Sequence, residues 1–456
     1  DWSVGDVSLT NILAHRRYKS ENGIDVDQSS ADILQLLRSD DMKFSSFEIR
    51  AAGSYESVDW LLGAFASEEK LKNFQTVFFG EQGGEYVGEV AGVGGALISL
   101  IPPGSGYTGD YDQDTRGWSV FTRNTWNASD TVKLTLGLRY SYEKKTATGI
   151  INGAKVGSII NDDFCKFVPV ASMCDNQSFK SKIDDDVVTG SFSAGWEFQE
   201  LKNLYASYSR GYKSGGINLN QDAVGTLDPI TGLYIDASVF DPELVDAYEI
   251  GLKSEWMDRK ITANFAAFYQ EVEDYQLNTF NGVSLEISNL PKVTSQGVEF
   301  DGNWVVNDWA TLTGGLAYVD ARYGNNLTSD PSLDIANLEG KRVHDSPIWQ
   351  GNFSLSLEDQ AFTGWDVFSN VSVAYRSKVN TGANLDPNKD QDAVTLVDFQ
   401  LGLRSQDGTY EITVWGTNIT NEYVNNRIFD MPLQAGSYGT YFMDGRMTGL
   451  KATIHF

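Results

Sequence analysis

The sequence predicts an all-β protein, specifically a transmembrane antiparallel β-barrel of the up-and-down type, on three observations. Several long segments alternate strictly between apolar and polar residues. These segments run to about 10–14 residues, longer than an average soluble strand of about 5–6 and long enough to cross a hydrocarbon layer at a tilt. The connections between them are alternately short and long, as in the hairpins of an outer-membrane barrel.

The alternation is clearest in the stretch TVKLTLGLRYSYEK. Leu136 and Leu138 fall on one face of this segment, and Lys133 and Arg139 fall on the other, because successive side chains of a strand point to opposite sides. The same pattern returns in KITANFAAFYQ, WQGNFSLSL and VDFQLGLR. A strand in lipid must have every backbone group paired, which requires a closed barrel with an apolar outer face and a polar lumen.

About sixteen such segments follow one another along the chain, with boundaries that are soft by about 2–4 residues. The predicted strands lie near 7–18, 42–52, 56–69, 117–128, 131–144, 186–198, 202–213, 244–255, 259–274, 284–306, 309–322, 346–358, 363–378, 393–404, 408–420 and 446–456.

The predicted connections alternate in length. NASD, QELKN, WMDRK, VNDW and SQDGT are short polar turns suited to hairpins. The long connections lie near 19–41, 70–116, 145–185, 214–243, 323–345, 379–392 and 421–445, and only the link near 275–283 is ambiguous. In an outer-membrane barrel the short turns lie on the periplasmic side, so we expect both chain ends there and the long loops outside.

Two features of the connections and the end of the chain add detail. The segment SSADILQLLRSD, residues 29–40, predicts a short capped helix with Ile33, Leu34 and Leu37 on one side. The chain ends on Phe456 in mid-alternation, which resembles the signal that outer-membrane barrels present to their assembly machinery.

Composition excludes several classes of protein. Hydrophobic residues make up 41% and charged residues 21% of the 456, so the chain is neither disordered nor fibrous. The net charge of −27 argues against nucleic-acid backbones and anionic lipid headgroups as main partners. The chain contains no run of about 18 apolar residues, so the sequence predicts no membrane-spanning helix. No signal peptide precedes the first segment, so we expect a mature chain, a fragment or a cytosolic protein.

The two cysteines, Cys165 and Cys174, lie close together in DFCKFVPVASMCDN, and none occurs elsewhere. They predict a disulfide-closed loop in an oxidising compartment. A metal pair is disfavoured because no histidine or third cysteine is near. The strand count places both cysteines in an external loop, which is compatible with a disulfide.

Several stretches of the chain resemble the TonB-dependent receptors of the Gram-negative outer membrane. They are LTLGLRYSYEKK (134–145), NLYASYSRGYKSGGIN (203–218), DPELVDAYEIGLKSEW (241–256), SQGVEFDGNW (295–304) and ITVWGTNITNEYV (412–424), together with the terminal Phe456. The resemblance implies a barrel of twenty-two strands filled by an amino-terminal plug, with a short box that engages the TonB protein. It also implies energised import of a scarce nutrient of the siderophore-iron, cobalamin or saccharide class.

The chain departs from this family pattern, since we find no plug, no coupling box and only about sixteen strands. We therefore expect residues 1–456 to be the carboxy-terminal barrel portion of a longer receptor, with residue 7 opening its seventh strand. The expected partners are a TonB-type energy-coupling protein, outer-membrane lipid and lipopolysaccharide, and a small nutrient. No cofactor and no catalytic residue are expected.

Aromatic side chains on the predicted external loops are the candidate ligand contacts. They could stack on a sugar, a chelate ring or a macrocycle, or they could pack among themselves to hold a long loop together, which is the favoured interpretation. The candidates are Phe78, Phe79, Tyr86, Tyr107 and Tyr111 in the loop 70–116, and Tyr234 in the loop 214–243.

Two other groups of residues are candidates for metal binding or catalysis. Asp110, Asp112 and Asp114 in GDYDQDTRG resemble the start of a calcium loop, although the later ligand positions are not matched, and a solvated acidic turn is the default. His344 is next to Asp345 in RVHDSPIW, but neighbouring strand residues point to opposite faces, which disfavours a catalytic triad.

Two other functions fit a barrel. A passive porin-like channel of sixteen strands is complete in itself, and a surface adhesin would use the barrel as an anchor. One structural observable separates the receptor from the channel. In a self-contained pore the segments 7–18 and 446–456 pair directly, whereas in the receptor they lie apart.

Overall fold

The computed structural model describes residues 2–90, 101–153, 177–220, 238–280, 285–325, 327, 334–432, 434 and 436–456. Its main element is one antiparallel sheet of seventeen strands. These are β1 (Trp2–Val4), β2 (Val7–Asp25), β3 (Leu34–Tyr55), β4 (Val58–Phe79), β5 (Gly106–Asn127), β6 (Val132–Gly153), β7 (Gln177–Gln199), β8 (Lys202–Lys213), β11 (Glu243–Trp256), β12 (Ile261–Phe280), β13 (Leu285–Asn307), β14 (Ala310–Tyr323), β15 (Trp349–Phe362), β16 (Trp365–Arg376), β19 (Val394–Ser405), β20 (Tyr410–Thr417) and β23 (Met447–Ile454).

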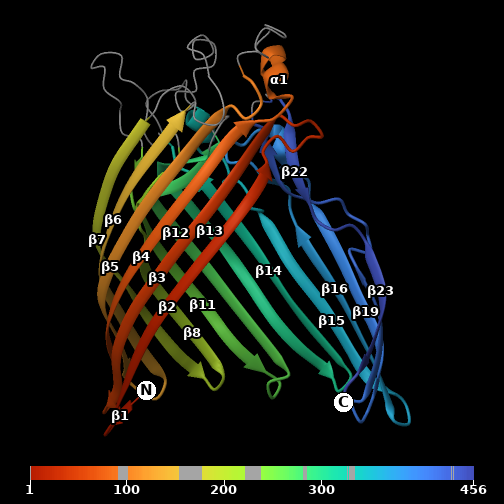
Figure 1. Cartoon of the computed structure of the whole chain (residues 1–456). Coiled ribbons are helices and arrows are strands. Elements are labelled where there is room, and N and C mark those ends of the chain that lie inside the picture. The colour runs from red at the N-terminus through yellow and green to blue at the C-terminus, as the bar shows by residue number, and fades with distance from the viewer. Residues whose placement is uncertain are drawn as a thin grey trace.

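The strands pair in chain order, each antiparallel to the next. Sixteen of them, β2 to β23, match the sixteen predicted segments, and β1 adds a three-residue piece paired to the start of β2. The fold class and the strand count are thus confirmed. Figure 1 shows the tilted strands, with the long connections at the top and both chain ends at the bottom.

Small elements occupy the connections at the upper end. Helix α1 (Gly83–Val90) follows β4, and the 3₁₀ helices η3 (Asp334–Leu338) and η4 (Pro387–Lys389) lie in two later connections. Three two-stranded pieces also lie there: β9 (Gly216–Ile217) with β10 (Val239–Phe240), β17 (Val379–Asn380) with β18 (Asp390–Gln391), and β21 (Asn425–Asp430) with β22 (Tyr438–Phe442). Among the described residues, no helix is long and apolar enough to cross a membrane.

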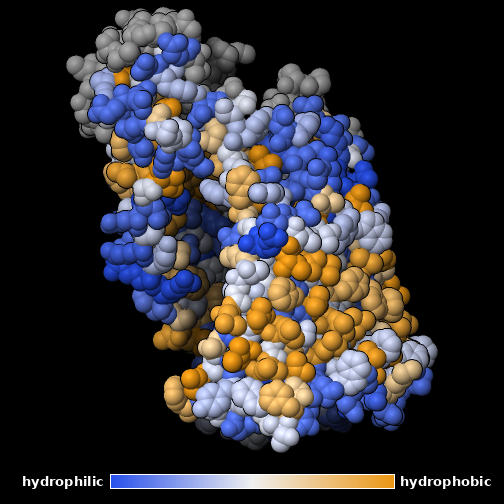
Figure 2. Space-filling view, turned by 90° about the vertical axis from the view of Figure 1, so that its right-hand side faces the viewer, coloured by the Kyte–Doolittle hydropathy of each residue, from blue (hydrophilic) through white to orange (hydrophobic). Residues whose placement is uncertain are grey.

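The strand register gathers apolar side chains on one face of the sheet. Leu13, Phe47, Ala66, Trp118 and Tyr142 are paired in sequence across five strands, so their side chains share a face. Most large exposed hydrophobic residues of the strands lie on this face. Figure 2 shows hydrophobic residues gathered on the lower right-hand part of the molecule, below a hydrophilic upper part. This is the division between a lipid-facing belt and an external portion.

The strands on the β2–β7 side are longer than predicted. They run for 19 to 23 residues and continue beyond the apolar belt as polar hairpins. The predicted connections 19–41 and 70–116 therefore shorten to 26–33 and 80–105. The sequence criterion relied on an apolar face, and the upper halves of these strands have charged outer faces, so the criterion ended each strand too early.

The helix predicted over 29–40 is wrong, because β3 begins at Leu34. The Asp27 carboxylate accepts hydrogen bonds from the backbone N–H groups of Ile33 and Leu34, at 3.3 and 2.9 Å, and so fixes a turn instead of a helical start. Ile33 and Leu34 are buried while Leu37 is exposed, so the three apolar residues do not share one face.

Two apolar clusters close the upper end of the sheet. The first gathers side chains of β3, β4, β5 and β6 around Ile33, Phe79, Tyr107 and Tyr111, with Val87 of α1 packed against them. The second gathers Leu277, Leu290, Tyr323 and Leu338 from β12, β13, β14 and η3. Each cluster anchors a long external connection to the inner side of the strands that carry it.

The sheet has two free edges. β2 pairs with β3 along its length and with β1 only at Val7–Leu9, and β23 pairs with β20. Within the described part of the chain, no pairing joins β2 to β23. Figure 2 shows the surface hollowed between two parts of the molecule. The sixteen strands are therefore not closed directly onto each other.

Candidate functional site

The structure places most of the predicted aromatic ligand contacts in the packing of an external connection. Phe79, Tyr107 and Tyr111 are 1%, 4% and 0% exposed and belong to the cluster under α1. Tyr86 packs on this cluster and is half-buried, and Phe78 is half-buried at the end of β4. The first three rings are buried beneath the connection that carries α1, where they pack against one another and leave no surface for a ligand.

Three predicted site residues lie outside the described residues. Cys165 and Cys174 fall between 153 and 177, and Tyr234 falls between 220 and 238. The disulfide and the Tyr234 contact stay predictions.

The three aspartates of the calcium prediction lie on a strand and not in a turn. Asp110, Asp112 and Asp114 are alternate residues of β5, so they point to one face but are spread along it. Asp112 forms an ion pair with Lys72 at 3.2 Å. No group of three metal-ligating side chains occurs among the described residues. The first and third of these residues are about 14 Å apart along an extended strand, so the three carboxylates do not surround one ion and the geometry gives no support for calcium.

His344 contacts Tyr323, a member of the second apolar cluster. Its Nδ1 atom is 2.8 Å from the hydroxyl of Tyr323, which is 2% exposed. Burial lowers the pKa of His344, and the carboxylate of Asp345 raises it by a smaller effect. The contact holds the connection after β14 against the strand, and among the described residues no hydrogen bond joins His344 to a serine.

A cavity of about 550 Å³ lies at the external end of the molecule. Its walls come from the ends of β2 and β3, the ends of β12 and β13, the β17–β18 connection and the β21–β22 hairpin. The first two strands lie at one free edge of the sheet, and the β21–β22 hairpin precedes β23 at the other. The side-chain amide of Gln434 also donates to the Asp27 carbonyl at 3.3 Å. The external connections thus approach each other across the opening, and the cavity lies between them.

This mouth cavity combines aromatic and charged side chains. Phe280, Phe429 and Tyr441 contribute rings, and those of Phe429 and Tyr441 are 5.2 Å apart. Arg427 is exposed and forms a 3.5 Å ion pair with Asp345. Aromatic faces and an accessible guanidinium suit a ligand with flat rings and negative charge.

A buried lysine holds the floor of the mouth cavity in place. Lys389 is 3% exposed, and its ammonium group is 2.5 Å from a carboxylate oxygen of Asp430 and 3.0 Å from Asn384. The hydroxyl of Tyr438 donates to Asp386 at 2.6 Å, which lowers the pKa of this carboxyl and raises that of the phenol. These contacts tie the β17–β18 connection to the β21–β22 hairpin.

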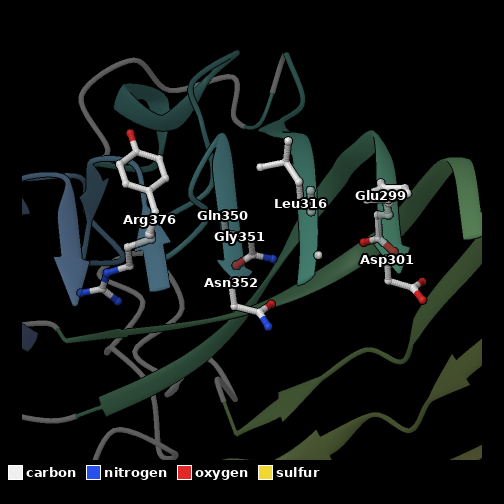
Figure 3. A pocket seen from close by; sticks show the side chains of 11 residues that line it. Glu299, Asp301, Leu316, Gln350, Gly351, Asn352 and Arg376 are labelled. Carbon is white, nitrogen blue, oxygen red and sulfur yellow. The ribbon is translucent and has the colours of Figure 1, made fainter. Parts of the chain in front are cut away.

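A second polar hollow, of about 360 Å³, lies on the wall formed by β13 to β16 (Figure 3). Glu299, Ala317, Gln350 and Arg376 are paired in sequence across these four strands and share a face. The neighbouring row on the same face carries Asp301, Gly315 and Asn352. The small side chains of β14 leave a trough between the acidic residues of β13 and Arg376.

The wall hollow faces the lumen, because Phe300, Leu316 and Tyr375 occupy the alternate row and point to the apolar side. Within the described part of the chain, the buried Nη2 atom of Arg376 has no hydrogen-bond partner. The lumen wall thus presents polar groups for water or another polar surface.

Sequence reasoning missed the mouth cavity. Its aromatic and charged residues are spread over four connections of ordinary composition, so no local motif marks them. The small hairpin β21–β22, which carries six of its residues, lies inside the predicted loop 421–445. A weak signal was present in NNRIFD, where polar and apolar residues alternate.

Comparison with protein-family models matches residues 2–421 to the family described as "TonB dependent receptor-like, beta-barrel". Among curated proteins, the pesticin receptor of Yersinia enterocolitica is 28% identical over 186 residues, which cover 41% of this chain and 23% of that protein. The probable TonB-dependent siderophore receptor PiuA of Acinetobacter baumannii is 24% identical over 193 residues, which cover 42% of this chain and 24% of that protein.

Comparison with solved structures supports the fold. The crystal structure of the ferric yersiniabactin uptake receptor FyuA from Yersinia pestis matches with a TM-score of 0.76 at 18% identity. The match covers 100% of this chain and 60% of the FyuA chain. The chain described here therefore spans about three-fifths of that structure.

Proposed function

This chain belongs to the TonB-dependent receptor β-barrel family of the Gram-negative outer membrane, and on that premise we propose that it forms the barrel wall of a receptor that imports a scarce nutrient. Iron bound to a siderophore is the proposed substrate class. Two features support this proposal: the family match over residues 2–421, and the siderophores named for several similar receptors.

The open sheet is the observation that favours a receptor over a passive channel as the function of this chain. A self-contained pore of sixteen strands requires β2 and β23 to pair, and the described residues of these strands do not. An unpaired edge in hydrocarbon leaves backbone groups unsatisfied at a cost of several kcal/mol each. We infer that further strands lie between β2 and β23 in the assembled protein.

The proposed role needs no bond to be made or broken. The external mouth cavity binds the chelate through its aromatic rings and Arg427, and the polar lumen lets it pass. A plug and a TonB-type coupling protein, both outside this chain, supply the gate and the energy in this proposal. The chain covers less than two thirds of the proteins it resembles, so these partners are inferred from the family.

Energy dependence of uptake tests the proposal. Cells that express the full receptor are given radioactive ferric iron as a catecholate or hydroxamate chelate, with and without a protonophore. We expect surface binding to persist in both conditions and accumulation to fall, in the presence of the protonophore, to that of cells lacking the receptor. Accumulation that is unaffected by the protonophore contradicts the proposal and supports a passive pore.

The mouth cavity gives a residue-level prediction. Arg427→Gln removes one charge-assisted contact to an anionic chelate and is expected to weaken surface binding about tenfold, or about 1.4 kcal/mol. The matched control is Arg446→Gln, because Arg446 is exposed and does not line the cavity. Equal binding by the two variants, measured with the same radioactive chelate, rules out this cavity as the ligand site.

A further inference from the structure

The charge that the mouth cavity offers to a ligand comes from few side chains. Among the lining residues that the structure describes, Lys389 and Arg427 are basic and Asp430 is acidic. Lys389 is 3% exposed and its ammonium group is 2.5 Å from the carboxylate of Asp430, so these two charges neutralise each other within the wall. Arg427 is the basic lining residue that remains, and its surroundings decide how much negative charge a ligand can carry.

Asp345 lies behind Arg427, outside the lining of the mouth cavity. Its carboxylate oxygen Oδ2 is 3.5 Å from the Nη1 atom of Arg427, and the two side chains are 41% and 51% exposed. A guanidinium has more N–H donors than one carboxylate can accept from, so this pairing still permits a contact with a ligand. The pairing also places a fixed negative charge next to the group that would bind an anion.

The backbone around Asp345 holds its carboxylate in place. The N–H group of Asp345 donates to the carbonyl of Asn380 at 2.8 Å. The preceding residue, His344, contacts the hydroxyl of the buried Tyr323 at 2.8 Å. The φ angle of Asp345 is +53°, in the left-handed region that Asp and Asn tolerate better than most residues. The position of this negative charge is therefore set by β17 and the second apolar cluster, whether or not a ligand is bound.

The stretches of chain that form the walls of the mouth cavity add further negative charge. Residues 24–36 carry three aspartates and no Lys or Arg, and residues 381–393 carry three aspartates and one lysine. Residues 425–446 carry two of each sign, and residues 278–285 carry no charge. A ligand with several negative charges would therefore meet one accessible guanidinium and an excess of carboxylates, which repel it.

We propose that Asp345 sets the charge selectivity of the mouth cavity, which accepts a ring-bearing ferric chelate with a single negative charge and rejects multiply charged chelates. The inference rests on the proposed function and narrows its substrate class. The rings of the chelate pack on Phe280, Phe429 and Tyr441, and its one anionic group accepts from Arg427. Each further negative charge is repelled by Asp345, so selectivity comes from an unfavourable contact as well as a favourable one.

A series of four tripodal ferric chelates tests this proposal. Each has three flat chelating rings, which are catecholates or hydroxypyridinones in the four possible proportions. A catecholate brings one more negative charge than a hydroxypyridinone, so the series runs from an uncharged complex to a trianion at nearly constant shape. Binding to the full receptor in detergent micelles at low ionic strength is measured by fluorescence quenching. We expect the monoanion to bind most tightly and the trianion about tenfold more weakly.

The variant Asp345→Asn removes the repelling charge and keeps the shape of the side chain. Asparagine also tolerates the left-handed backbone at this position. We expect the trianion to bind the variant about tenfold more tightly than the wild type, and the uncharged chelate to stay within about twofold. A merely structural effect would change the affinities for all four chelates alike. An unchanged ratio of the trianion and uncharged affinities therefore overturns the proposal, and so does a wild type that binds the trianion most tightly.

The matched control removes the same charge from the stretch that carries Arg427. Asp444 is exposed and does not line the mouth cavity. Asp444→Asn is expected to leave the ratio of the trianion and uncharged affinities within about twofold of the wild-type value, because the charge lies outside the cavity. A change as large as that of Asp345→Asn shows that overall charge sets the selectivity, which overturns the role of Asp345.

The salt dependence of binding to the wild type decides the matter if Asp345→Asn does not assemble. Salt screens the repulsion between the trianion and the carboxylates, so we expect the trianion to bind more tightly as ionic strength rises. Weaker binding of the trianion at high salt shows net attraction and overturns the proposal.

The same measurements distinguish failure of this inference from failure of the proposed function. If the chelates bind and accumulate in cells without the expected charge preference, the inference alone is wrong. If none of the four binds to the receptor and none accumulates, the proposed function is wrong and the inference falls with it.

Discussion

Replacement of Leu136 by arginine is expected to lower the free energy of unfolding by about 2–4 kcal/mol. Leu136 lies in β6, in the middle of the apolar rows, and is 46% exposed on the face that we assign to lipid. A guanidinium at this depth lies in hydrocarbon, where no water or counter-charge solvates it. Denaturant titration of the receptor in lipid vesicles measures the change.

A control on the neighbouring strand separates this effect from a loss of strand propensity. Ser193 in β7 pairs with Thr135, so it faces the lumen at the same height. Ser193→Arg places the same side chain in water, and we expect a change below about 1 kcal/mol, as for most surface substitutions. Equal destabilisation by the two variants shows that the assignment of faces is wrong.

Replacement of Tyr111 by alanine is expected to lower the free energy of local unfolding of the connection that carries α1 by about 3–5 kcal/mol. Tyr111 is 0% exposed in the first apolar cluster, its ring lies 6.2 Å from that of Phe179, and its hydroxyl accepts from Gln75 at 3.2 Å. Its truncation leaves a cavity beneath the connection. Hydrogen exchange of the amides of α1 measures the lost protection.

The control for Tyr111 is an aromatic residue of β4 that lies outside the cluster. Phe74 is 46% exposed on the outer face, and its partner across the strands is Asp110. Phe74→Ala is expected to leave the opening free energy of the α1 amides, measured by hydrogen exchange, within about 0.5 kcal/mol of the wild-type value. If both variants loosen α1 equally, the cluster does not hold the connection.

The strands were predictable because each has one apolar face in hydrocarbon. In β6 the alternation of Leu134, Leu136 and Leu138 with polar residues gives the type, direction and faces of the strand from sequence alone. The sixteen segments and the common location of the two chain ends follow from repeating this argument. The lipid environment enforces the pattern, so it is strong wherever lipid is present.

The upper halves of the strands were not predictable by the same criterion. Above the belt, both faces of β2 and β3 meet water or the inner clusters, so Arg17, Lys19, Lys43 and Asp41 break the apolar alternation. Backbone pairing continues there because hairpin partners are already in register. The apolar run around Ile33 and Leu34 fits a helix or a strand, and the Asp27 turn decided between them.

The mouth cavity could not be found from sequence because its parts meet only in three dimensions. Phe280 and Arg427 are far apart along the chain, and the packing of the external connections brings them together. The buried rings of Tyr107 and Tyr111 show the converse, since an aromatic loop residue can serve packing alone. The composition of a loop does not distinguish aromatic residues that bind a ligand from those that only pack the loop.

The division of side chains between hydrocarbon outside and water inside is tested most directly by a spin-label scan of β6. Nitroxide labels are placed one at a time at residues 132–143 of the receptor in lipid vesicles, and collision rates with oxygen and with a nickel chelate are measured. The account predicts that oxygen access peaks at Leu134, Leu136 and Leu138, and that nickel access peaks at the residues between them. Collision rates that do not alternate, or nickel access equal on both faces, contradict it.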